Sequence, residues 1–154
     1  MTGFFSKLFG GGKKASASGS EAAEIAEEIL AGVVSKSGLD LTFSFTSEMD
    51  GEREELFVEI DGADTELVTE KEGALLESLQ LLVKRVMQHR LSNKDVEVTM
   101  DCNNYREESS RSLVELADKL RDRALEQGRS VYLRALPPKD RKVVHQHLAN
   151  DVRV

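Results

Sequence analysis

The chain has 154 residues, 40% of them hydrophobic, which is room for one ordinary domain or two small ones sharing a core. No apolar run approaches the roughly 20 residues that span a bilayer, and the single cysteine, Cys102, cannot form an internal disulfide, which predicts a reducing, cytoplasmic location. The net charge of −7 argues against nucleic-acid binding by the chain as a whole, but residues 15–89 hold 5 basic against 17 acidic residues, whereas residues 90–154 hold 13 against 11. Any phosphate-binding surface is therefore expected in the C-terminal half.

Residues 1–20 form a basic segment rich in glycine and serine, and their composition predicts a flexible tail because it cannot bury a core. The first part of this segment fits two alternatives, a disordered tail or a weak anchor at a membrane surface. In the second alternative, one helical face would carry four apolar side chains flanked by lysines. These side chains are Phe4, Phe5, Leu8 and Phe9.

From residue 21 the sequence predicts a helix followed by a β-hairpin. Ser18 and Glu21 have the spacing of a capping box, and the apolar stripe of the helix ends before Gly38. Apolar residues then alternate on both sides of a turn at Asp50-Gly51, which is typical of two paired strands. The alternating residues are Leu39, Leu41, Phe43 and Phe45 before the turn and Leu56, Val58 and Ile60 after it.

Two helices and a third strand are expected next, so that residues 21–102 have the order α-β-β-α-α-β. The first of these helices runs from Asp64 to about Thr69, and the second, longer one follows Gly73. Its predicted core-facing residues are Leu75, Leu76, Leu79, Leu82, Val83, Val86 and Met87. The third strand contains Val96, Val98 and Met100.

Residues 103–154 predict a second, smaller unit with the order α-β-α. A helix that starts near Tyr105 stops at Gly128, and a strand follows at Val131, Leu133 and Ala135. Pro137-Pro138 then opens a helix in which Val144 and Leu148 are expected to be buried. A final strand, expected at residues 152–154, is cut short by the end of the chain. The fold class is therefore α+β, with two small units in series.

The loop between the two consecutive helices carries the first chemical signal. The element order, with the stretch from Leu76 to Gln80, resembles a bacterial-type KH domain of the Jag (SpoIIIJ-associated) family. In such domains this loop reads Gly-x-x-Gly, because a bare backbone must approach the RNA phosphates closely. Here the loop is degenerate, since it reads Glu70-Lys71-Glu72-Gly73. Two glutamates near the phosphates favour a fold kept as scaffold or dimer surface over direct RNA clamping.

The second signal is the motif Arg141-Lys142-Val143-Val144-His145 in the last predicted helix. Four residues turn about 400° around a helix, so Arg141 and His145 project from one face. Arginine forks onto phosphate or stacks on a base, and histidine stacks or donates a hydrogen bond. Lys139, Lys142 and Arg134 would widen this cationic surface. A second Arg-x-x-x-His pair, Arg85 and His89, is interpreted as incidental.

The context of the motif resembles the R-three-H domain of the same family. It includes Tyr105-Arg106 before the long helix, Gly128-Arg129 after it, and Leu136-Pro137-Pro138 before the motif. The resemblance assigns residues 21–102 to a KH-like domain and residues 103–154 to an R-three-H domain. Two departures from the family pattern are a C-terminally shortened R-three-H domain and the absence of the N-terminal Jag domain.

The resemblance implies binding of single-stranded RNA or DNA and post-transcriptional regulation linked to cell growth or envelope processes. It also implies a small KH-only protein as a partner. The alternative is a protein–protein adaptor whose two modules have lost RNA binding. No enzymatic activity, cofactor, metal or small-molecule substrate is predicted, because His145 and His147 lie about 200° apart on a helix and no nucleophile–base set is apparent.

Overall fold

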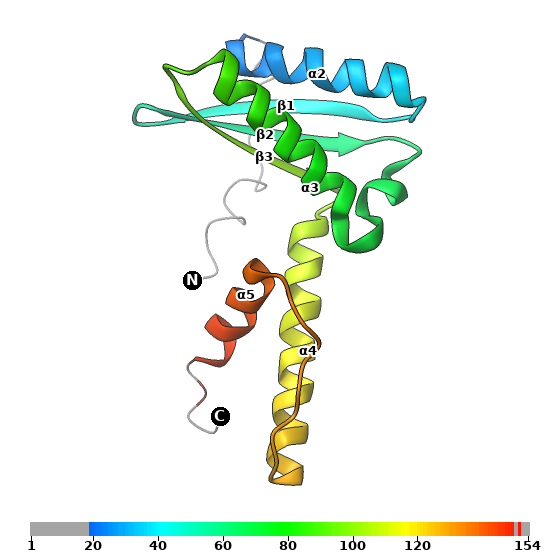
Figure 1. The fold of residues 1–154 in the computed structure, drawn as a ribbon, viewed down its shortest axis with the longest axis vertical. Helices are drawn as coiled ribbons and strands as arrows, with labels where there is room; N and C mark the ends of the chain where they lie inside the picture. The colour runs from blue at the N-terminus through cyan, green and yellow to red at the C-terminus, as the bar shows by residue number, and fades with distance from the viewer. Residues whose placement is uncertain (1–18, 150, 152–154) are drawn as a thin grey trace, which may run out of the picture. The chain divides into compact units, whose positions relative to one another are not determined.

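The computed structural model describes residues 19–149 and 151, and the chain divides into two compact units, residues 1–103 and residues 104–154 (Figure 1). Two predicted features lie outside the described residues: the N-terminal tail with its apolar side chains and the strand at residues 152–154. None of the helices formed by the described residues is both long and apolar enough to cross a membrane.

The first helix, α2 (Glu21–Ser37), confirms the predicted apolar stripe and its end at Gly38. Ala22, Ala26 and Leu30 are fully buried, and Gly38 ends the helix in a left-handed conformation with φ of 74°. The capping prediction was wrong in its position, because Ser20 is the N-cap and its Oγ accepts the Ala23 N–H at 3.0 Å. The extended backbone of Ser20 turns its hydroxyl toward the first turn of the helix.

The sheet of the first unit has the order β1-β2-β3, with β1 (Thr42–Asp50), β2 (Arg53–Asp61) and β3 (Asp95–Cys102). The hairpin is confirmed: β1 and β2 are antiparallel and are joined by a two-residue turn, so Asp50 lies opposite Arg53. β3 runs parallel to β2, with Asp95 opposite Arg53. The buried face of the sheet carries Leu56, Val58 and Ile60 of β2 and Val98, Met100 and Cys102 of β3.

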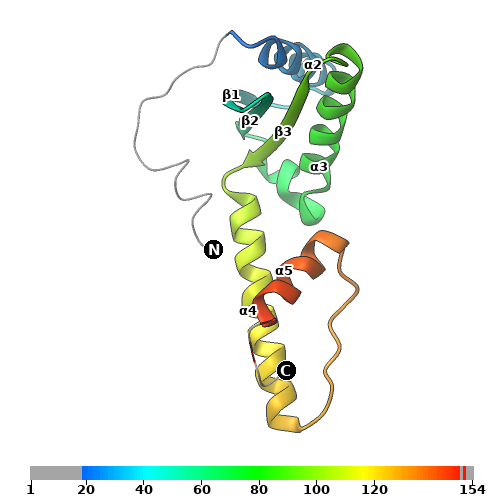
Figure 2. The same ribbon diagram turned by 90° about the vertical axis from the view of Figure 1, so that its left-hand side faces the viewer.

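Helices α2 and α3 (Thr65–Arg90) cover the buried face of the sheet and contact each other (Figure 2). Residues 70–73 depart from helical geometry, so α3 consists of the two helices that the sequence predicts. Leu76, Leu79, Val83 and Met87 of the predicted stripe are buried, whereas Leu82 is 42% exposed because it lies at the edge of the stripe. The observed order α-β-β-α-α-β confirms an α+β fold.

The second unit contains α4 (Tyr105–Gln127) and α5 (Pro138–Leu148), which pack against each other. The predicted stop at Gly128 is confirmed, with φ of 58°. The predicted strand at residues 131–135 was wrong, because the segment 129–137 forms neither helix nor strand. No strand within the described part of the chain pairs with it. Val144 and Leu148 are half-buried rather than buried, since a unit of two helices covers the apolar face of α5 incompletely.

Candidate functional site

A pocket in the second unit brings together three of the five residues that the sequence predicts as nucleic-acid-binding. Arg134, Arg141 and His145 line this pocket, whereas Lys139 and Lys142 are not among its lining residues. The remaining lining residues are Leu133, Ala135, Leu136 and Val144, and the volume is about 370 Å³. The pocket therefore combines an apolar lining with two guanidinium groups and an imidazole.

Two segments that follow each other in the chain build the pocket. The segment 129–137 contributes Arg134 and the buried Leu136, and α5 contributes Arg141 and His145 one helical turn apart. Pro138 stands at the first helical position, where its fixed φ favours the helix, and the Arg141 N–H donates to the Pro137 carbonyl at 3.0 Å. This helix start fixes which side chains of α5 face the preceding segment.

The lining combines groups that can contact a phosphate with groups that can contact a planar ring. Guanidinium groups bind phosphate in a forked geometry and also stack on bases, and apolar walls accept the face of a planar ring. Lys139 and Lys142 are exposed on the same helix and add positive charge beside the pocket. The arrangement suits an anionic ligand with a flat, apolar part better than a small polar metabolite.

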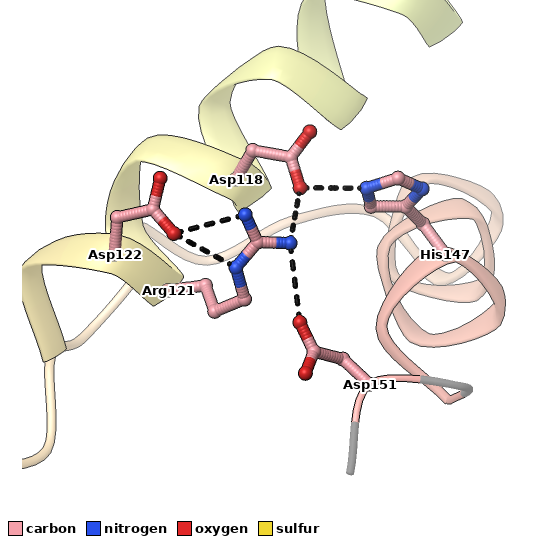
Figure 3. A network of polar contacts seen from close by, with 5 residues as sticks. All are labelled: Asp118, Arg121, Asp122, His147 and Asp151. Carbon is pink, nitrogen blue, oxygen red and sulfur yellow. Dashed lines mark hydrogen bonds and ion pairs between the residues drawn. The ribbon is translucent and has the colours of Figure 1, made fainter. Parts of the chain in front are cut away.

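A network of ion pairs centred on Arg121 connects α4 with α5 and with the residues that follow it (Figure 3). The guanidinium of Arg121 is 17% exposed, and its Nη1 lies 2.7 Å from Asp118 Oδ1 and 3.3 Å from Asp151 Oδ2. Asp122 accepts from Nε and Nη2 of Arg121 at 3.0 Å and 2.9 Å. His147 Nε2 of α5 lies 2.8 Å from Asp118 Oδ1. The network therefore holds α5 at a defined position on α4.

The opposite charges of this network stabilise each other's ionised forms. The hydrogen bond with His147, followed by the charges of His147 and Arg121, lowers the pKa of Asp118 from its usual value. The hydrogen bond to Asp122 and the carboxylates around it raise the pKa of Arg121 further above neutrality. The contacts of Arg121 with Asp118 and Asp122 could be predicted from the sequence, since these residues are neighbours on one helix. The sequence contains no local signal for His147 and Asp151, which reach the network only through the packing of α5.

The degenerate loop of the first unit has a defined backbone. Glu70 is extended, and Lys71, Glu72 and Gly73 follow in left-handed conformations with φ of 50°, 62° and 72°. The side chains of Glu70, Lys71 and Glu72 are exposed, whereas Gly73 is buried. The loop thus presents two glutamates and one lysine to solvent. Arg85 and His89, the second Arg-x-x-x-His pair, lie on α3 in this unit and are not among the residues that line the pocket.

Nucleophile and metal chemistry have little support among the described residues. Cys102 is fully buried, and burial, followed by the charge of Glu59, raises the pKa of its thiol, which disfavours the thiolate. No group of three or more histidine, cysteine or acidic residues is arranged to hold a metal ion in the described ranges 19–149 and 151.

Comparison with known proteins finds several relatives that share one name, and no family model matches the chain. RNA-binding protein KhpB of Clostridium symbiosum is 30% identical over 113 residues, which cover 73% of this chain and 50% of that protein. RNA-binding protein KhpB of Bacillus subtilis is 32% identical over 90 residues, 58% of this chain and 43% of that protein. The protein of the same name from Streptococcus pneumoniae is 30% identical over 107 residues, 70% of this chain and 32% of that protein. The chain therefore spans half or less of the length of these relatives.

Proposed function

This chain belongs to the Jag family, the family of RNA-binding protein KhpB, and we propose that it binds single-stranded RNA through the pocket of its second unit. The name shared by the relatives supports RNA as the ligand. The observation that carries the proposal is the pocket itself, in which Arg134, Arg141 and His145 surround an apolar lining. In this proposal the first unit is a KH-type domain and the second an R-three-H-type domain.

The chemistry of the pocket favours a single strand over a duplex. A base that enters the pocket must leave its stack, which an unpaired strand allows at little cost. Its face would contact the apolar walls at Leu133 and Val144, while Arg141 pairs with the adjoining phosphate. His145, one turn further along α5, would donate to or stack on the same nucleotide. Lys139 and Lys142 would contribute to attraction at longer range.

The proposal is tested by titrating a fluorescent single-stranded oligoribonucleotide with wild type, Arg141→Ala and His145→Ala. Each substitution is expected to weaken binding by about 1–3 kcal/mol, the usual range for a charge-assisted hydrogen bond or a stacking contact. Arg123→Ala, on the exposed side of α4, removes the same charge outside the pocket and is the matched control. Wild-type affinity in both pocket variants, with the fold intact by circular dichroism, would contradict the proposal.

The cellular role that we propose is post-transcriptional regulation linked to cell growth or envelope processes. The first unit would then serve as a contact surface for a small KH-only protein. Recovery of RNA after crosslinking in cells, with wild type and with the double variant Arg141→Ala/His145→Ala, tests the contact with RNA on which this role depends. RNA that is recovered equally with both proteins would contradict it.

A second candidate function is that of a protein–protein adaptor. It is favoured by the two exposed glutamates of the loop, Glu70 and Glu72, and by the acidic excess of residues 15–89. Both features repel phosphate. The oligonucleotide titration separates the two functions, since an adaptor that has lost RNA binding gives no saturable binding with the wild-type protein.

A further inference from the structure

Tyr132 is the most exposed large side chain among the described apolar and aromatic residues, with 90% of its surface open to solvent. It lies in the segment 129–137, in which Val131 and Leu133 are half-buried and Tyr132 and Arg134 are exposed. Tyr132 and Arg134 are thus two exposed side chains separated by one half-buried residue. Leu133 and Arg134 both line the pocket, so Tyr132 directly precedes two lining residues in the chain.

An aromatic ring in this position needs an explanation, because its exposure leaves it little packing energy. Aromatic side chains stabilise proteins mainly by burying their surface, and a ring that is 90% exposed buries almost none. Tyr105, the other tyrosine of the chain, is half-buried at the start of α4. The exposed ring is also placed among positive charges, since Arg129 and Arg134 lie three residues before and two residues after it.

We propose that Tyr132 is a base-stacking residue, which binds the unpaired nucleobase next to the nucleotide held in the pocket; this inference rests on the proposed function. Exposed aromatic rings next to arginines are the standard platform on which bases of single strands stack. Two residues of chain span at most about 7 Å, which keeps Tyr132 within one nucleotide of Arg134. The interface thus extends from α5 along the segment 129–137 and contacts at least two successive nucleotides.

The first test compares Tyr132→Phe with Tyr132→Leu in the titration of a single-stranded oligoribonucleotide. Phenylalanine keeps the ring, so its affinity is expected to stay within about twofold of wild type, whereas leucine is expected to weaken binding about fivefold to a hundredfold. The fold is expected to survive both changes because the side chain is exposed. Equal affinity of Tyr132→Leu and wild type would overturn the stacking role.

An abasic oligonucleotide of the same length is the matched ligand control. It offers the same phosphates without bases, so wild type and Tyr132→Leu are expected to bind it equally. A difference between the two proteins on the abasic strand would overturn the stacking role, because it would mean that Tyr132 acts on the backbone or on the shape of the segment.

Fluorescence provides a direct reading of the ring. The chain has two tyrosines and no tryptophan, so the variant Tyr105→Phe leaves Tyr132 as its single fluorophore. Stacking on a base is expected to quench this emission as the normal oligonucleotide is added, and the abasic strand is expected to leave it nearly unchanged. Unchanged emission at saturating normal oligonucleotide would overturn the inference.

The same experiments separate the inference from the proposed function. If Arg141→Ala weakens binding and Tyr132→Leu does not, the pocket binds RNA and the stacking role is wrong. If wild type shows no saturable binding to any single strand, the proposed function fails and the role of Tyr132 fails with it.

Discussion

Lys71 and Glu72 hold left-handed backbone conformations that cost a residue other than glycine roughly 1–2 kcal/mol each. The packing on both sides of the loop maintains them. Val68 before the loop is fully buried, and Gly73 at its end and Leu76 after it are buried as well. The loop therefore keeps a left-handed backbone at two residues other than glycine, and its exposed side chains add two negative charges and one positive charge.

The charge of this loop is expected to limit RNA affinity. Glu72→Lys replaces a negative by a positive side chain at an exposed position and keeps the backbone preference of the residue, so the fold is expected to remain. If the loop lies near the RNA backbone, affinity is expected to rise by about 1 kcal/mol, close to fivefold. Titration of a single-stranded oligoribonucleotide measures the change.

Glu48→Lys is the matched control for the loop variant. Glu48 is exposed on β1, in the same unit, and its replacement changes the net charge by the same amount. An equal rise in affinity for both variants would indicate long-range attraction alone. Unchanged affinity for Glu72→Lys would mean that the loop is distant from the RNA and that the first unit is scaffold.

At the scale of whole elements, the position of α5 depends on the Arg121 network. Its carboxylates come from α4 and from Asp151 beyond α5, and His147 joins it from α5 itself (Figure 3). The apolar contacts of α5 are incomplete, since the helix has no fully buried residue. We therefore expect the polar network to contribute to the position of α5, and with it to the positions of Arg141 and His145.

Removal of this network is expected to loosen α5. Arg121→Ala should increase amide hydrogen exchange across Val143–Ala149 and weaken RNA binding, while Arg123→Ala on the same helix should do neither. Asp151→Asn separates the two effects more clearly. The loss of a negative charge would by itself strengthen RNA binding, whereas a displaced α5 is expected to weaken it. Unchanged exchange in α5 for Arg121→Ala would show that apolar packing alone positions the helix.

The network also predicts a dependence on pH. The folded-state pKa of Asp118 is lowered, so its contribution to stability is present above the usual carboxyl pKa and is lost as the pH falls through the lowered value. Hydrogen exchange in α5 is therefore expected to accelerate at acidic pH more in wild type than in Asp118→Asn, after correction for the intrinsic exchange rate.

At the scale of the whole molecule, the net charge of −7 repels the negatively charged RNA that we propose as the ligand. If binding depended on the total charge, added salt would screen the repulsion and strengthen it. Local contact of the pocket cations with phosphates predicts instead that added salt weakens binding, because each contact releases counterions. With two to four contacts, a plot of log affinity against log salt is expected to fall with a slope between about −1.4 and −2.8. A flat or rising plot would contradict phosphate contact.

Local patterns were sufficient to predict most elements of the fold. Leu56, Val58 and Ile60 alternate in the sequence and are buried together, because a strand turns successive side chains to opposite faces. Gly38 and Gly128 end helices where the sequence predicts it, since each adopts a left-handed conformation that other residues avoid. Gln80, noted as part of a family signature, accepts the Met100 N–H at 3.0 Å and so connects α3 to β3.

The sequence by itself determined the α+β class, the order of the elements in the first unit and the spacing of Arg141 and His145, because each depends on residues close together in the chain. Only the tertiary structure decided that the segment 129–137 forms no strand, since a strand needs a neighbour that no local pattern reveals. It also decided which cations share a pocket: Arg134 joins Arg141 and His145, whereas Lys139 and Lys142 stay outside it. Helix packing sets these distances, and it depends on contacts such as Arg121 with Asp151, thirty residues apart in the sequence.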